Sequence, residues 1–533
     1  MPDPTRANVF KDEGNALFAK KEYAAAYEKY TDAIREDGTN AVLYANRAAC
    51  SLNMKSYLDA VDDSEKATEI DPKYSKAWGR LATAAHQLAL YSKSAEAFEE
   101  ALGTLPQENL SPAEVRLKKQ YEDGLNAARE AETRGTSGEH LVVSRGGLAR
   151  SEAPFLRAMA MKEELIASGE ERRTSSAWVI LGAYQEFSEG VQIMKQLYTA
   201  STPDETFRSA LDGLANGILR DERAFYMDSP HWTKIFNRQV LMEIHRYGAW
   251  TKESTTSIIE EALKLQREKG WDFVRPALST TVRGFIMRGF LGGGLHGDYG
   301  PGVEYIGRAL EILDWGRKAW KDVPIVDKGT IFSDTFTRGV RRLHIQTLMQ
   351  AVAKTEGGMR ELLESLLARA DEILRDLDTN PAIPWGEHDP GFVSSFYIYP
   401  RGEALAIKGF YHRERTRAMT SPEREDYIRK AADFYLQAAE VYPEDDENHV
   451  WYLKTSLDHL WHCGTPLSVT LPMLERIRLG APKIRKIWEH SSLALQGRDK
   501  SIRSYEMMEE DIRAGLARGE FSMDQLLMPG PPM

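Results

Sequence analysis

Five polar residues near the start of the chain have types and spacings suited to carboxylate binding: Lys11, Asn15, Asn46, Lys76 and Arg80. Lys11 and Asn15 are four residues apart, as are Lys76 and Arg80, and side chains four apart lie on one face of a helix. Hydrogen bonds from cations to a carboxylate are shorter and stronger than neutral ones. Three cations and two amides converging in one groove would form a receptor for carboxylates, which indicates a binding partner rather than a reaction.

A repeat of 34 residues supplies the helices that could bring these residues together, in the segments 7–40, 41–74 and 75–108. The fourth position of each segment is a large aromatic residue: Phe10, Tyr44 and Trp78. The eighth is small: Gly14, Ala48 and Ala82. Small residues let two helices approach closely, and stacked neighbours bury a face that no single repeat buries alone. The pattern predicts three helical hairpins, with residues 112–132 as a capping helix.

This pattern resembles the tetratricopeptide repeat (TPR), and the resemblance covers about a quarter of the chain. In a TPR stack the first helix of each hairpin lines the concave surface. The five polar residues resemble the carboxylate clamp of TPR cochaperones of Hsp70 and Hsp90, which bind the chaperones' C-terminal Glu-Glu-Val-Asp tail. All five clamp positions carry the expected residue types. The resemblance implies that Lys11, Asn15, Asn46, Lys76 and Arg80 hold the terminal aspartate.

The remainder of the chain is predicted to be helical without a family resemblance that its residues reveal. We expect an all-α fold: a three-repeat TPR domain with its capping helix, then a larger irregular helical region of TPR-like, α-solenoid character. The expected divisions are a TPR domain over 1–135, a linker over 136–155, an irregular helical region over 156–299, a degenerate TPR-like region over 300–520 and a disordered tail over 521–533. Apolar residues at spacings of three and four support the helices, and Pro203, Pro230 and Gly270 interrupt them.

The amino-acid composition indicates which kinds of partner the protein binds and in which cellular compartment it lies. The formal net charge is -11, which argues against nucleic acid as a general partner and restricts attraction of an acidic tail to a local basic groove. Cys50 and Cys463 are the two cysteines, as expected of a reducing compartment. No apolar run approaches the roughly 18 residues of a membrane span, and the first residues do not resemble a signal peptide. We expect a cytoplasmic protein without a membrane partner, and leave nuclear access open.

Three short motifs resemble chemical sites, and each has a simpler interpretation. The glycine-rich stretch 292–300 lacks the strand and lysine of a phosphate loop, which favours a flexible loop between helices. His459, His462 and Cys463 lack a second ligand pair, which favours ordinary helix residues. The acid and base at 387–389 have no accompanying nucleophile, which favours a loop. We expect no catalytic residue, metal site or cofactor.

The sequence favours a non-catalytic cochaperone or adaptor that binds the tail of Hsp70, Hsp90 or both. Its C-terminal helical region would bind a client or a second partner. Two alternatives stay open. One is an enzyme with an unrecognised helical active site that the clamp delivers to chaperones. The other is a TPR assembly scaffold for a non-chaperone acidic C-terminus.

Overall fold

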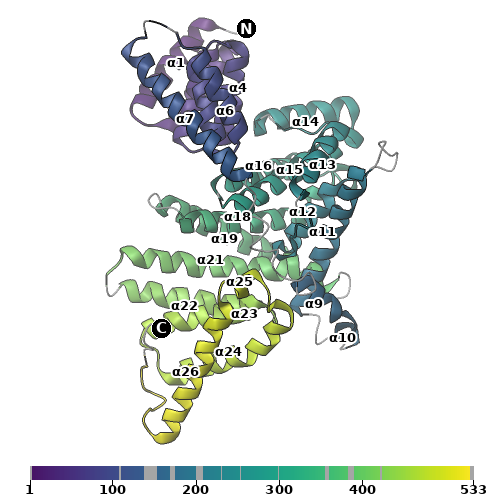
Figure 1. Ribbon diagram of the computed structural model, residues 1–533, viewed down its shortest axis with the longest axis vertical. Coiled ribbons are helices and arrows are strands. Elements are labelled where there is room, and N and C mark those ends of the chain that lie inside the picture. The colour runs from purple at the N-terminus through teal and green to yellow at the C-terminus, as the bar shows by residue number, and fades with distance from the viewer. Residues whose placement is uncertain are drawn as a thin grey trace. The chain divides into compact units, whose positions relative to one another are not determined.

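The computed structural model describes most of the chain and is all-α (Figure 1). The described residues are 3–106, 108, 110–136, 153–167, 174–199, 208–229, 231–251, 254–297, 299–354, 359–381, 389–420 and 423–527. Within these ranges, β-structure is limited to an isolated antiparallel bridge between Pro466 and Leu526. The chain divides into two compact units. Unit 1 comprises Met1–Leu141 and Arg246–Ala319, and unit 2 comprises Val142–His245 and Trp320–Met533.

Three helical hairpins and a capping helix form the start of unit 1, which confirms the predicted TPR fold. The helices are α1 (Pro4–Ala19), α2 (Tyr23–Glu36), α3 (Ala41–Asn53), α4 (Tyr57–Ile70), α5 (Ser75–Gln87), α6 (Tyr91–Gly103) and α7 (Pro112–Thr136). Ala48 and Ala82 are fully buried. A Cβ on Gly14 would lie 2.8 Å from the Tyr30 ring, so this position admits no larger residue without rearrangement.

The turn inside each hairpin is built alike. Lys21, Lys55 and Ala89 each adopt a positive φ, of 63°, 61° and 56°. They occupy equivalent positions of the three repeats. A left-handed backbone is unusual for a residue with a Cβ, so each turn is held by the packing of its two helices rather than by a glycine.

Three further helices complete unit 1: α14 (Thr255–Lys269), α15 (Trp271–His296) and α16 (Tyr299–Ala319). The predicted loop over 292–300 is wrong at both ends, because α15 continues through the glycines to His296 and α16 begins at Tyr299. Gly293 accommodates the Tyr299 ring, which would lie 2.7 Å from a Cβ there, and the helix ends at the left-handed Gly297. The expected boundary between residues 299 and 300 falls within the first turn of α16, which packs on α15.

Unit 2 is also helical, and helices that are adjacent in its sequence pack on each other. Its N-terminal part holds α9 (Pro154–Ala160), α10 (Lys162–Ala167), α11 (Ser176–Thr199), α12 (Ala210–Arg220), η4 (Glu222–Ala224) and α13 (Trp232–Tyr247). Its later part holds α17 (Ile325–Lys328), η5 (Thr330–Phe332), α18 (Asp334–Lys354), α19 (Met359–Thr379), α20 (Pro390–Val393), η6 (Ser394–Ile398), α21 (Tyr399–Arg415), η7 (Thr416–Ala418), α22 (Glu423–Val441), α23 (Glu447–His462), α24 (Leu467–Trp488), α25 (Ser492–Leu495) and α26 (Arg498–Arg518). The expected irregular region over 156–299 is therefore shared between the two units.

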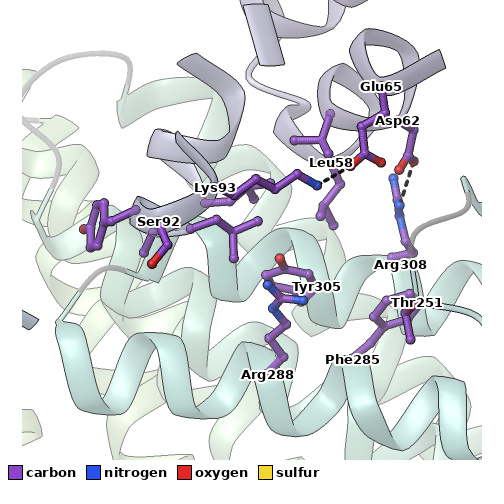
Figure 2. Close-up of a pocket in the computed structure, with 15 residues that line it drawn as sticks. Leu58, Asp62, Glu65, Ser92, Lys93, Thr251, Phe285, Arg288, Tyr305 and Arg308 are labelled. Carbon is purple, nitrogen blue, oxygen red and sulfur yellow. Dashed lines mark hydrogen bonds and ion pairs between the residues drawn. The ribbon is translucent and has the colours of Figure 1, made fainter. Parts of the chain in front are cut away.

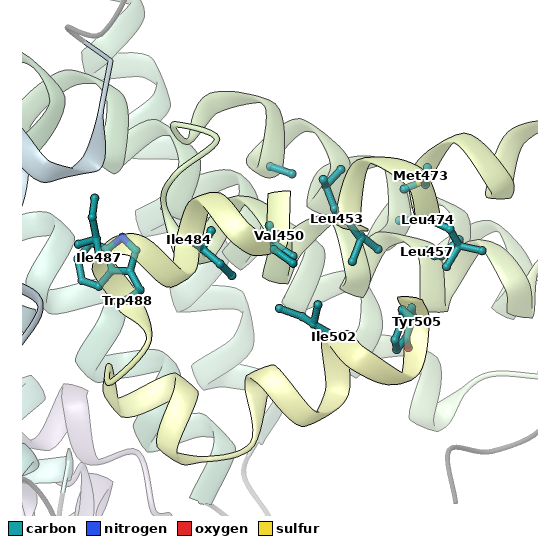
Figure 3. Close-up of a cluster of buried hydrophobic side chains, with 14 of the residues drawn as sticks. Val450, Leu453, Leu457, Met473, Leu474, Ile484, Ile487, Trp488, Ile502 and Tyr505 are labelled. Carbon is teal, nitrogen blue, oxygen red and sulfur yellow. The ribbon is translucent and has the colours of Figure 1, made fainter. Parts of the chain in front are cut away.

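A buried apolar cluster holds α23, α24 and α26 together (Figure 3). Its members include Val450, Leu453, Leu457, Leu474, Ile484, Trp488 and Ile502. Phe521 and Leu527, within the expected tail, pack against the same cluster, whereas Met523 and Leu526 between them are exposed. The remaining tail residues lie outside the described chain, as does the expected linker apart from residues 136 and 153–155.

In the part of the chain that the structure describes, none of the helices combines the length and apolarity needed to span a membrane.

Candidate peptide-binding site

The first helices of the three hairpins carry all five predicted groove residues. Lys11 and Asn15 lie on α1, Asn46 on α3, and Lys76 and Arg80 on α5. Asn15 and Lys76 are exposed, and the other three are half-buried. All five side chains are therefore at least partly open to solvent and available to a ligand.

Asn15 and Asn46 are directly joined across α1 and α3. The Asn46 Nδ2 donates to Oδ1 of Asn15 at 3.4 Å. The same oxygen accepts a second hydrogen bond, from the Tyr30 hydroxyl at 2.8 Å. With its oxygen engaged twice, the Asn15 amide has a fixed orientation and presents its NH₂ donors away from these partners.

Arg80 carries an unsatisfied donor. Its Nη1 is buried, and none of the residues that the structure describes accepts a hydrogen bond from it. Burial raises the pKa of Tyr30 to about 12, and the positive charge of Arg80 opposes this rise, which places the guanidinium near the Tyr30 ring. A buried cationic donor without an acceptor is costly unless a ligand supplies one. A carboxylate is the natural complement.

The two lysines are less constrained. The Lys11 Nζ donates to Oδ1 of Asn8, on its own helix, at 2.7 Å. Lys76 has no ion-pair partner within the described ranges. The geometry thus joins Asn15 to Asn46 and places the charge of Arg80 near Tyr30, whereas no hydrogen bond or ion pair among the described residues joins either lysine to them.

Arg47, beside Asn46, is a supporting residue that the sequence did not identify. Its Nε and Nη2 donate to the two carboxylate oxygens of Asp63 at 2.9 and 2.7 Å, and its Nη1 donates to the Thr31 hydroxyl at 3.1 Å. The guanidinium also stacks over the Tyr27 ring, 5.2 Å from its centroid. These contacts fix α3 against α2 and α4, and hence the position of Asn46. The sequence offered little signal, because a single arginine on a helix gives no indication of a buried partner 16 residues later.

The other motifs occupy ordinary positions. His459 Nδ1 is 2.6 Å from the Thr455 carbonyl oxygen on the same helix, and Cys463 is buried. Glu387 and His388 lie outside the described residues, while Asp389 caps α20 by accepting a hydrogen bond from the Phe392 amide at 2.9 Å.

No model of a protein family matches the chain. Its N-terminal part is nevertheless similar to several curated proteins. The heat shock protein sti1 homolog of Schizosaccharomyces pombe is 36% identical over 132 residues, which are 25% of this chain and 21% of that protein. The Aspergillus fumigatus protein named heat-shock protein cognate (HSC) co-chaperone sgt12 is 41% identical over 101 residues, 19% of this chain and 29% of its own length.

The N-terminal domain resembles cochaperone TPR domains. A third relative, Hsp70-Hsp90 organizing protein 1 of Glycine max, is 34% identical over 100 residues, 19% of this chain and 18% of that protein. The chain thus spans less than a third of the length of these three relatives, and the similarity concerns the TPR domain.

Proposed function

We propose that the TPR groove of this protein binds the C-terminal carboxylates of the Glu-Glu-Val-Asp tail of Hsp70, Hsp90 or both. In this proposal the protein is a non-catalytic, cytoplasmic cochaperone or adaptor. The observation that supports it best is the unsatisfied Nη1 of Arg80, on the helix next to the one that carries Asn46 in the groove-lining series α1, α3 and α5. None of the described residues supplies an acceptor for this Arg80 donor, and an anionic ligand would complement it.

Each groove residue has a role in this proposal. Arg80 and Lys76 neutralise the charge of the terminal aspartate, Asn15 and Asn46 donate from their amides, and Lys11 completes the cationic side of α1. The overall charge of -11 means that attraction is local to the groove, which suits a short docking peptide. The similarity to a protein named Hsp70-Hsp90 organizing protein supports the choice of chaperone tails among acidic C-termini.

The helical regions after the TPR domain, over 156–299 and 300–520, are proposed to bind a client or a second partner. Their paired helices offer extended surfaces of the kind that helical repeat proteins use for this purpose. This part of the proposal rests on architecture and does not affect the assignment of the groove.

Calorimetric titration of the full-length protein with peptides ending in the Hsp70 and the Hsp90 tails tests the proposal. We expect micromolar binding to at least one peptide, and loss of binding when the same peptide is amidated at its C-terminus. The ratio of the two affinities identifies the preferred chaperone. Absence of binding to both peptides would overturn the proposal and leave a TPR scaffold for another ligand.

A matched pair of variants separates the groove from the general charge of the domain. Lys76→Ala removes an exposed cation of the groove, while Lys118→Ala removes an exposed cation of α7 outside it. Both remove one charge, so a loss of affinity in the first alone assigns binding to the groove.

A further inference from the structure

Within unit 1, the start of α4 is capped by a residue from a distant part of the sequence. The Glu304 carboxylate on α16 accepts hydrogen bonds from the Tyr57 amide at 2.9 Å and the Leu58 amide at 2.8 Å, one on each oxygen. No side chain at the N-cap of α4 does so. Because the first amides of a helix lack partners within it, a carboxylate there satisfies them and complements the helix dipole.

One turn later on α16, Arg308 binds two carboxylates of α4. Its Nη2 lies 2.8 Å from Asp59 Oδ1, and its Nη1 lies 3.0 Å from Asp62 Oδ2. The arginine side chain is only 6% exposed. We call the set Asp59, Asp62, Glu304 and Arg308 the acidic junction. Its three carboxylates and one guanidinium give a net charge of -2 when all are ionised.

The surrounding charges do not cancel this excess. On α4, Asp63 is paired with Arg47 of α3, and Glu65 with Lys93 of α6. Two further charges lie at the edge of the junction. Glu311 of α16 is exposed and accepts from the Thr255 hydroxyl, and the exposed Arg288 of α15 stacks over the Tyr305 ring at 4.7 Å. The junction therefore keeps more negative charge than its neighbours compensate.

A cavity of about 500 Å³ lies beside the acidic junction (Figure 2). Apolar side chains from both sides line it, among them Leu58 and Val61 of α4 and Phe285 of α15. The polar contacts of Glu304 and Arg308 connect α4 and α16 directly.

We propose that the docking of α16 on α4 is a proton-linked switch: the acidic junction takes up protons when it forms, so docking tightens as the pH falls through neutrality and loosens above it. A protonated Glu304 carboxyl keeps its carbonyl oxygen as an acceptor, so one of the two amide hydrogen bonds persists while the excess negative charge is reduced.

The titration of the junction residues supports this direction. Burial raises the pKa of Asp62 to about 7, against the opposing effect of Arg308. Burial likewise raises the pKa of Glu304 to about 7, against the opposing effects of the Leu58 and Tyr57 amides and, more weakly, Arg308. Undocked, the same groups would be exposed and acidic. The docked form therefore binds more protons than the undocked form. The stabilisation of docking by these protons is greatest well below pH 7 and is lost as the pH rises through 7. For one such carboxyl, linkage changes the docking equilibrium about tenfold between pH 6 and pH 8.

Hydrogen exchange at the Tyr57 and Leu58 amides tests the proposal, because these two amides donate to Glu304. In the full-length protein, protection corrected for intrinsic exchange should fall at least about tenfold from pH 6 to pH 8. The variant Asp62→Asn should show a smaller fall, and Asp62→Asn combined with Glu304→Gln should show none. Glu69→Gln, an exposed change on the same helix, is the control and should behave as the unaltered protein.

Two results would overturn the switch: protection that does not vary with pH in the unaltered protein, or a full pH dependence that survives in Asp62→Asn. Amide protection within α1 and α3 reports whether each variant is folded. If the double variant does not fold, the comparison of Asp62→Asn with Glu69→Gln decides the question alone.

Discussion

The Tyr30 hydroxyl on α2 donates a 2.8 Å hydrogen bond to the Asn15 amide oxygen on α1 and so orients the side chain of this groove residue. Replacing Tyr30 with Phe removes this bond and leaves the ring in place. We expect tail affinity to fall by about 0.5–1.5 kcal/mol, the usual net value of one hydrogen bond, with a small effect on stability. Titration with the tail peptide measures the change. Tyr23→Phe, outside this network, is the control, and equal affinity in all three proteins would contradict the assigned role.

Arg80→Ala should cost about 2–5 kcal/mol of tail affinity, because it leaves a bound carboxylate without its partner. Arg80→Lys should give an intermediate loss, since lysine keeps the charge but lacks the planar fork that binds both carboxylate oxygens. Lys76→Ala should also weaken binding, and raised salt should weaken it in the unaltered protein. Calorimetry provides all of these values. If neither alanine variant changes affinity, the groove is not the binding site.

Arg47→Ala should destabilise the TPR domain by about 3–5 kcal/mol, because it leaves the buried Asp63 carboxylate uncompensated. Urea unfolding followed by circular dichroism measures this. Arg35→Ala, which breaks an exposed pair with Asp32, should cost less than about 1 kcal/mol. Replacing Arg47 and Asp63 together by apolar residues should restore part of the loss. A similar cost for Arg47→Ala and Arg35→Ala would refute the supporting role of Arg47.

His412 in unit 2 should make that unit sensitive to acid. Its ring stacks on Phe434, and burial together with Lys430 and Lys408 lowers its pKa to about 4. The folded state thus favours the neutral imidazole. The stability it contributes is complete above the ordinary pKa of about 6.5 and is lost as the pH falls from there towards 4.

An NMR titration of the imidazole protons gives the His412 pKa directly, and the melting temperature at pH 7 and pH 5 gives its effect on stability. His412→Gln should reduce the fall in melting temperature on acidification, while His462→Gln, an exposed position, should not. An NMR pKa near 6.5 would show that burial and the two lysines do not lower the His412 pKa.

The TPR domain could be predicted because its information is local and periodic. Phe10, Tyr44 and Trp78 recur with the small residues four positions later, and Tyr121 and Ala128 of the expected capping helix are indeed buried. The hairpin turns at Lys21, Lys55 and Ala89 could not be predicted, because their left-handed backbone is imposed by the helices they join and not by glycine.

Long-range partners could not be predicted. Glu304 lies in a stretch that reads as an ordinary amphipathic helix, and only folding brings it to the amides of α4. The Arg47 contact with Asp63 depends in the same way on how α3 and α4 pack. For the groove, residue types and repeat positions indicated five candidates, but the contact of Asn15 with Tyr30 and the unsatisfied Arg80 donor became visible only in three dimensions.

Glu304 follows Tyr57 by 247 residues, which sets an order of events during synthesis. At typical ribosomal rates of about 5–20 residues per second, the start of α4 emerges roughly 12–50 seconds before the carboxylate that caps it. Helices α1, α3 and α5, with all five groove residues, are made well before α16. A nascent chain therefore exposes its groove while unit 1 is still unfinished, and the growing polypeptide itself can be the first form of this protein to meet a ligand.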